Sequence, residues 1–178
     1  MPISLPKPKY TSAFWDIIWS RPYLNYEQHQ KYFWEKIRTH SKGIILDLGC
    51  GSASCWKGYD VSLVGVDFSY EACKQASFNC PNSSFIQSDI TEAPLQDHFF
   101  DTIVLSGVVN YYHDLTKILK KVKKLVARDG CIIITINVIK DFPGRVWDID
   151  RIFKEFGKLG HLRAEFADKI GWFVFIQT

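Results

Sequence analysis

The chain has 178 residues, of which 47% are hydrophobic and 15% aromatic, and its formal net charge is +3. This length is typical of one domain, and the composition excludes general disorder because it supplies enough apolar surface for a packed core. The charge is too small to indicate nucleic acid, and no apolar run reaches the length of a secretory leader or a membrane span. Five cysteines lack Cys-x-x-Cys spacing, so we expect reduced thiols, no metal and a cytoplasmic location.

The first 42 residues differ in texture from the rest of the chain. Three prolines near the start predict a flexible lead-in. Two aromatic-rich stretches follow, near residues 11–20 and 26–38, with apolar residues at helical spacing and Pro22 between them. We predict that residues 1–42 form a helical cap and that residues 43–178 form the core of the same single domain.

From residue 43 onward, short apolar runs rich in valine and isoleucine alternate with amphipathic helical patterns. Such runs are typical of parallel strands that helices cover on both faces. The connection between the last two runs is too short for a crossover helix but permits an antiparallel hairpin. The sequence therefore predicts an α/β fold with a seven-stranded, mostly parallel sheet that ends in an antiparallel hairpin. The predicted strands are residues 44–48, 63–66, 85–86, 102–105, 131–136, 162–166 and 172–176, with helices beginning near Ser69, Asp114 and Ile149.

A glycine turn directly follows the first predicted strand. The sequence there is Asp47-Leu48-Gly49-Cys50-Gly51, so a buried strand ends in an acid and runs into a Gly-x-Gly turn. Glycines let the backbone approach a ligand where a Cβ would clash, and the helix expected next presents free N–H groups. This pattern indicates a nucleotide-type ligand at the end of the strand.

Two more acids, Asp67 and Asp89, end the next two predicted strands. Together with Asp47 they are expected at the carboxyl ends of three strands, which is where open α/β sheets bind ligands. A dinucleotide-binding turn would carry a third glycine at the position of Ser54, and a pyrophosphate would sit poorly beside Asp47. S-adenosylmethionine carries a sulfonium and an ammonium group but no phosphate, so the three acids favour this cofactor.

With these motifs, the chain resembles the class I S-adenosylmethionine-dependent methyltransferases, in particular the broad type 11-like group with the Asp-Leu-Gly-Cys-Gly signature. The resemblance covers residues 43–178, including Phe99-Phe100-Asp101 before the fourth strand and the terminal hairpin. It implies a Rossmann-like fold with S-adenosylmethionine as the cofactor. The implied cofactor-binding residues are Asp47, Gly49, Cys50 and Gly51 at the methionine part, Asp67 at the ribose, Phe68, Asp89 and Ile90 at the adenine, together with Ser88 and Ser106.

Two departures from the family pattern concern the first helix of the core. Ala53 replaces a frequent third glycine, and the segment from Gly51 to Asp67 is a few residues short and contains Gly58. We therefore expect a stunted helix after the glycine turn. The departures bear on the affinity for the cofactor rather than on its identity.

Candidate residues for the methyl acceptor come from two segments. Asn110 and Tyr111, after the fourth predicted strand, could orient an acceptor, while His113 could act as a general base or simply lie near the next helix. The N-terminal aromatic residues either pack as ordinary core or form a lid that touches cofactor and acceptor. These aromatic residues are Tyr10, Phe14, Trp15 and Trp19.

We therefore expect a methyltransferase that modifies an oxygen or nitrogen of a small-molecule acceptor. Two alternatives stay open, a methyltransferase for protein or RNA and a non-catalytic cofactor-binding partner subunit. Nucleic acid is not the expected partner, because the main basic feature is predicted to be the solvated face of one helix. Its members are Lys117, Lys120, Lys121, Lys123 and Lys124.

Overall fold

The fold is described from a computed structural model, which covers residues 11–20, 27–112, 114–137, 149–167 and 171–178. The elements lie at the sheet's two faces and within it, in the order that follows. They are α1 (Ser12–Trp19), α2 (Glu27–His40), β1 (Ile44–Leu48), the 3-10 helix η1 (Ser54–Trp56), β2 (Ser62–Asp67), α3 (Tyr70–Asn79), β3 (Ser84–Gln87), β4 (Phe100–Ser106), η2 (Val109–Tyr111), α4 (Thr116–Leu125), β5 (Val126–Asn137), α5 (Ile149–Phe156), η3 (Gly157–Leu159), β6 (His161–Ala167) and β7 (Gly171–Gln177).

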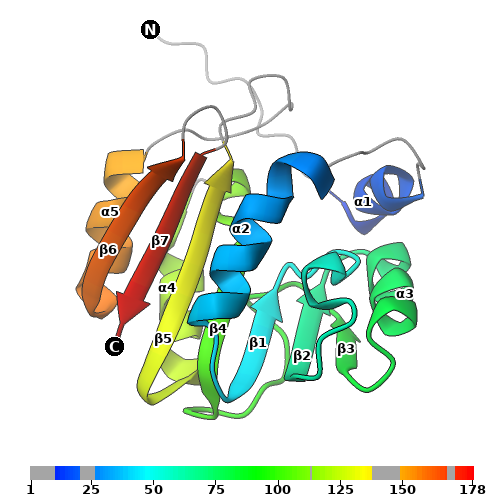
Figure 1. Cartoon of the computed structure of the whole chain (residues 1–178), viewed down its shortest axis with the longest axis horizontal. Coiled ribbons are helices and arrows are strands. Elements are labelled where there is room, and N and C mark those ends of the chain that lie inside the picture. The colour runs from blue at the N-terminus through cyan, green and yellow to red at the C-terminus, as the bar shows by residue number, and fades with distance from the viewer. Residues whose placement is uncertain (1–10, 21–26, 113, 138–148, 168–170) are drawn as a thin grey trace, which may run out of the picture.

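The strands form one sheet in the order β3-β2-β1-β4-β5-β7-β6 (Figure 1). β3, β2, β1, β4 and β5 are parallel, whereas β7 runs antiparallel to both β5 and β6. The predicted seven-stranded sheet with a terminal antiparallel hairpin is therefore confirmed. Because the strand order reverses at β1, with β2 on one side and β4 on the other, the carboxyl ends of β1 and β4 flank the place where such sheets bind ligands.

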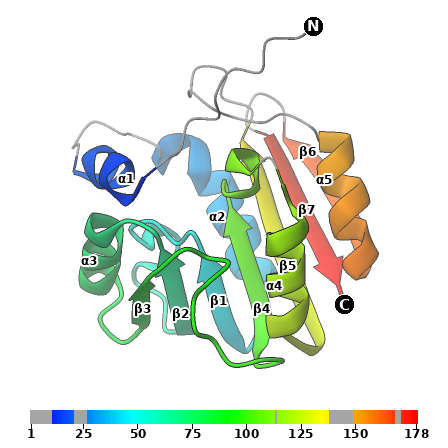
Figure 2. The same cartoon turned by 180° about the vertical axis from the view of Figure 1, so that it is seen from behind.

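Helices cover both faces of the sheet, α2 on one and α4 with α5 on the other (Figures 1 and 2). Successive strand residues alternate between these layers, so Ile45 belongs to the apolar cluster that includes Phe33 and Ile37 of α2, and Leu46 to the cluster that includes residues of α4 and α5. Burial on both faces explains why the strands show no polar alternation. No helix in the described part of the chain is long and apolar enough to cross a membrane.

Local details confirm one prediction about the helices and strands and refine two others. The helix after the glycine turn is stunted, since only the three-residue η1 forms there. Helix α4 begins at Thr116 rather than at Asp114, and the Asp114 carboxylate accepts the Thr116 N–H at 2.9 Å. Strand β5 begins at Val126, well before the predicted start at Cys131, because Val126 pairs with Phe100 across a shift in register.

Candidate functional site

The glycine turn after β1 is anchored to the neighbouring strand. The backbone N–H groups of Gly49 and Cys50 both donate to the Val66 carbonyl, at 2.7 and 3.1 Å. Gly49 has a φ of +77°, and a Cβ there would come within 2.4 Å of Cγ2 of Val108, which follows β4. Glycine is therefore required at residue 49 both by the backbone conformation and by the close approach of the β4 segment.

Asp67, at the end of β2, connects the glycine turn to the start of α3. Its Oδ2 accepts the Gly51 N–H and its Oδ1 accepts the Ser69 N–H, both at 2.9 Å. The side chain is buried, and this burial raises the pKa of its carboxyl above the ordinary value, although the two N–H donors favour the charged form. Each carboxylate oxygen has a second lone pair, so the carboxylate keeps acceptor capacity for a ligand.

Asp47, in β1, is held by a residue that the sequence analysis did not single out. The Trp56 indole N–H in η1 donates to Asp47 Oδ2 at 2.7 Å, and both side chains are buried. Oδ1 of Asp47 is also buried, and it has no hydrogen-bond partner among the described residues. Burial raises the pKa of Asp47 to about 7, against the opposing effect of the Trp56 hydrogen bond. The signal for Trp56 was an N–H donor shortly after a strand-terminal acid, in a segment too short for a normal helix.

The other predicted cofactor residues divide into two groups. Ser88 is tied to the site, because its N–H donates to the Asp67 carbonyl at 2.9 Å, and Phe68 beside it in the sheet order is exposed. The Asp89 carboxylate instead accepts the N–H and hydroxyl of Thr91, at 2.8 and 2.7 Å. The Ile90 side chain belongs to the buried apolar core.

Two polar residues of the predicted cofactor set have their own internal partners. The Ser106 hydroxyl at the end of β4 lies 2.9 Å from the Thr135 hydroxyl of β5. Burial raises the pKa of the Cys50 thiol well above its ordinary value, so this thiol stays protonated and neutral. Neither residue therefore adds a charge to the site.

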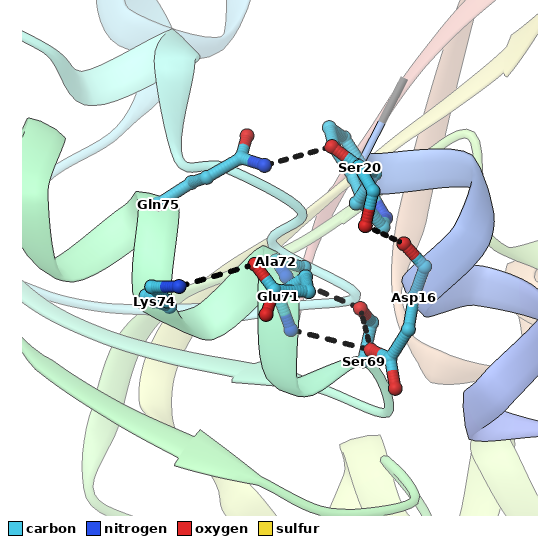
Figure 3. Close-up of polar contacts among 8 residues, drawn as sticks. Asp16, Ser20, Ser69, Glu71, Ala72, Lys74 and Gln75 are labelled. Carbon is cyan, nitrogen blue, oxygen red and sulfur yellow. Dashed lines mark hydrogen bonds and ion pairs between the residues drawn. The ribbon is translucent and has the colours of Figure 1, made fainter.

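Helix α1 docks on the site through polar contacts with α3 (Figure 3). Asp16 Oδ1 accepts the Ser69 hydroxyl at 2.6 Å and the Glu71 N–H at 3.2 Å, and the Gln75 side chain donates to the Trp19 carbonyl at 2.8 Å. The Ser69 hydrogen bond lowers the pKa of Asp16. Sequence reasoning missed Asp16, whose only signal was a single acid in an otherwise apolar, aromatic helix.

Aromatic residues of α1 reach two other parts of the site. The Trp19 ring lies against Gly51, since a Cβ there would come within 2.5 Å of two of its atoms. The Trp15 and Tyr111 rings meet edge to face, with centroids 5.1 Å apart, and Phe14 packs on Trp15. Helix α1 therefore contacts the glycine turn, the start of α3 and η2 at once.

The acceptor candidates differ in what the structure says of them. Asn110 is only 1% exposed, and neither its amide oxygen nor its amide nitrogen has a hydrogen-bond partner within the described ranges. A buried amide without partners is costly, so this side chain is expected to meet a ligand. Tyr111 is half-buried beside Trp15. His113 and Tyr10 lie outside the described residues.

Comparison with known proteins gives a family match and one curated relative. The model of the family described as "Methyltransferase domain" matches residues 46–134, which is half of the chain. A malonyl-[acyl-carrier protein] O-methyltransferase from Pseudescherichia vulneris is 28% identical over 111 residues, or 61% of this chain and 44% of the relative. The matched part thus spans less than half of the relative's length.

Solved structures share the whole fold at low sequence identity. A Methanococcus maripaludis protein to which S-adenosylmethionine-dependent methyltransferase activity is ascribed has a TM-score of 0.74 at 16% identity, covering 99% of this chain and 97% of its own. A methyltransferase-like protein in complex with the Haloferax volcanii Trm112 methyltransferase activator has a TM-score of 0.73 at 14% identity, with coverage of 92% and 93%. At these identities the likeness concerns the fold.

Proposed function

The chain belongs to the methyltransferase domain family of class I S-adenosylmethionine-dependent methyltransferases, and we propose that it transfers a methyl group from this cofactor to an oxygen or nitrogen of a small-molecule acceptor. The observation that carries the proposal is the pair of buried acids, Asp47 and Asp67, at the ends of neighbouring parallel strands around the glycine turn. Two buried carboxyl groups favour a cationic ligand and disfavour a phosphate.

The residues present fit S-adenosylmethionine. Oδ1 of Asp47 lacks a donor, and the α-ammonium group of the cofactor has three. Asp67 retains lone pairs that could accept the two ribose hydroxyls, in a carboxylate that Gly51 and Ser69 already hold in place. We assign the remaining cofactor contacts to the backbone of Gly49, Cys50 and Gly51, to Phe68 with Ser88, Asp89 and Ile90 at the adenine, and to Ser106.

We assign the acceptor to the space between η2 and α1. When bound, S-adenosylmethionine supplies an electrophilic methyl group on a positively charged sulfur. The task of the chain is then to hold the acceptor atom in line, and positioning of this kind accounts for much of the rate in such reactions. The unpartnered amide of Asn110 can donate to and accept from an acceptor, while Trp15 and Tyr111 offer it aromatic surface.

The size of the acceptor follows from the position of α1. This helix contacts the glycine turn, the start of α3 and η2, so it covers the approach to the proposed site. A cover of this kind favours a small acceptor, or a small group carried on a larger molecule, as in the relative that methylates malonyl-[acyl-carrier protein]. A carrier-bound acyl group is therefore the second candidate acceptor.

Calorimetric titration tests the proposal in two steps. The full chain should bind S-adenosylmethionine and its product S-adenosylhomocysteine, and it should not bind NAD. Release of S-adenosylhomocysteine is then measured across a panel of small hydroxy acids, phenols, amines and a malonyl-carrier protein, with RNA as a further member. If neither cofactor form binds, the proposal is wrong; binding without turnover on any acceptor would favour the non-catalytic partner subunit.

A further inference from the structure

We infer that Trp56 is a positioning residue, whose indole N–H fixes the Asp47 carboxylate so that its second oxygen meets the α-ammonium group of S-adenosylmethionine. This inference rests on the proposed function, because it concerns how the cofactor is held. It assigns a role to the shortened segment after the glycine turn, in which only the three-residue η1 forms. A tryptophan there takes part in the site from beneath the turn.

The Trp56 indole is held firmly in place. The side chain is 1% exposed and lies in the same apolar cluster as Phe33 and Ile37 of α2. Its backbone N–H donates to the Ala53 carbonyl at 2.9 Å, and the preceding carbonyl, that of Cys55, accepts Nε of Arg38 at 2.6 Å. A donor fixed in this way constrains the rotation of the Asp47 carboxylate through the 2.7 Å bond to Oδ2.

The free oxygen of Asp47 identifies the part of the cofactor that it meets. Oδ1 is buried without a hydrogen-bond partner among the described residues, so it calls for a hydrogen-bond donor from a ligand. The α-ammonium group donates hydrogen bonds, whereas the sulfonium has no hydrogen to donate. The hydrogen-bonding chemistry thus favours the ammonium group, and it predicts that ligands without the amino-acid part do not sense Trp56.

The charges around Asp47 make the interaction depend on pH. The groups that face it are the acid Asp67 from β2 and three buried thiols, those of Cys50 in the turn, Cys55 in η1 and Cys80 after α3. Burial raises the pKa of Asp47 to about 7, and the Trp56 hydrogen bond opposes this effect. Removing the indole N–H should raise the pKa of Asp47 further, so that more of the protein carries a neutral Asp47 near neutral pH.

The experiment measures dissociation constants of two ligands for the wild type and for Trp56→Phe, from about pH 6 to about pH 9. S-adenosylhomocysteine carries the α-ammonium group, and 5′-methylthioadenosine lacks the amino-acid part. We expect Trp56→Phe to weaken S-adenosylhomocysteine about tenfold near pH 7, equivalent to about one unit in the pKa of Asp47, and less near pH 9. Binding of 5′-methylthioadenosine should change less than about twofold.

Two controls separate positioning from damage to the core. Phe33→Leu disturbs the same apolar cluster without touching Asp47, so it should leave the difference between the two ligands unchanged. In an Asp47→Asn background, Trp56→Phe should have little further effect on S-adenosylhomocysteine, because no carboxylate remains to be positioned. If Trp56→Phe does not fold, site-specific β-(3-benzothienyl)alanine keeps the bicyclic shape and removes only the N–H.

Equal weakening of both ligands, or a loss that does not vary with pH, would overturn the inference and leave a purely structural role for Trp56. Unchanged binding of S-adenosylhomocysteine in the variant would overturn it as well. A wild-type protein that binds neither ligand would instead contradict the proposed function itself, so the two failures are distinguishable.

Discussion

Trp19 of α1 lies directly against Gly51 of the glycine turn, so closely that a Cβ at residue 51 would come within 2.5 Å of Cη2 and Cζ2 of the indole. The same glycine donates its N–H to Asp67 and has a φ of +53°, a conformation that residues with a Cβ rarely adopt. The position of α1 and the shape of the turn therefore depend on one another. A change at either residue is expected to reach the proposed cofactor site.

Gly51→Ala should weaken the cofactor site more than it destabilises the fold. The added Cβ meets Trp19 and strains the backbone, so we expect a loss of about 1–2 kcal/mol in the free energy of unfolding from strain alone, with a further loss from the clash. Affinity for S-adenosylhomocysteine should fall at least about tenfold. Gly58→Ala is the matched control, because Gly58 has a φ of +79° but no atom within 4 Å of its Cβ position. Equal losses of affinity in both variants would contradict this account.

Asp16→Asn should loosen helix α1. The Asp16 carboxylate sits at the start of α3, where negative charge is favoured, and accepts hydrogen bonds from Ser69 and Glu71. We expect a loss of about 1 kcal/mol in the free energy of unfolding and faster amide hydrogen exchange in α1, with weaker cofactor binding. Asp60→Asn, at an exposed acid, serves as the control. Unchanged exchange in α1 would show that Asp16 does not hold the helix.

The same contact predicts a pH dependence at the acid end. The pKa of Asp16 is lowered in the folded protein, so its contribution to stability is present above the ordinary value of 3.8 and is lost as the pH falls through the lowered pKa. The difference in unfolding free energy between the wild type and Asp16→Asn should therefore shrink in acid. A difference that stays constant down to about pH 2 would contradict the assignment.

Sequence patterns identified the parts of this molecule that are local in the chain. The strand-terminal acids Asp47 and Asp67 and the glycine turn follow from periodicity and turn chemistry, and the topology follows from the lengths of the connections. The partners of these acids could not be predicted in the same way. Asp16 meets Ser69 across 53 positions of sequence, and such a contact leaves no periodic trace in either segment. Trp56 was hidden because a buried indole is usually core, whatever its N–H does.

Asp47→Asn should stabilise the protein without ligand at neutral pH. The pKa of Asp47 rises from 3.8 to about 7 on folding, so the folded state holds a proton that the unfolded state loses, and wild-type stability should fall between about pH 4 and pH 7. The variant lacks this decline, and its advantage above pH 7 should reach a few kcal/mol, at most roughly 4. Urea unfolding at about pH 5 and pH 8 measures it. Cofactor affinity should fall, and a variant less stable than the wild type at pH 8 would contradict the pKa argument.

Asn110→Leu should exchange activity for stability at the acceptor side. Because neither end of the buried Asn110 amide has a partner in the described structure, an apolar side chain of similar shape should keep or raise the free energy of unfolding, by up to about 1–3 kcal/mol. The matched control is Thr102→Val, which removes a buried hydroxyl that bonds to both the N–H and the carbonyl of Lys42 and should therefore be destabilising. Affinity for S-adenosylhomocysteine should change little in Asn110→Leu, while kcat/KM for the acceptor found in the panel should fall at least about tenfold. Full activity in this variant would remove Asn110 from the acceptor site, and a large loss of stability would mean that its amide has a partner in the folded chain.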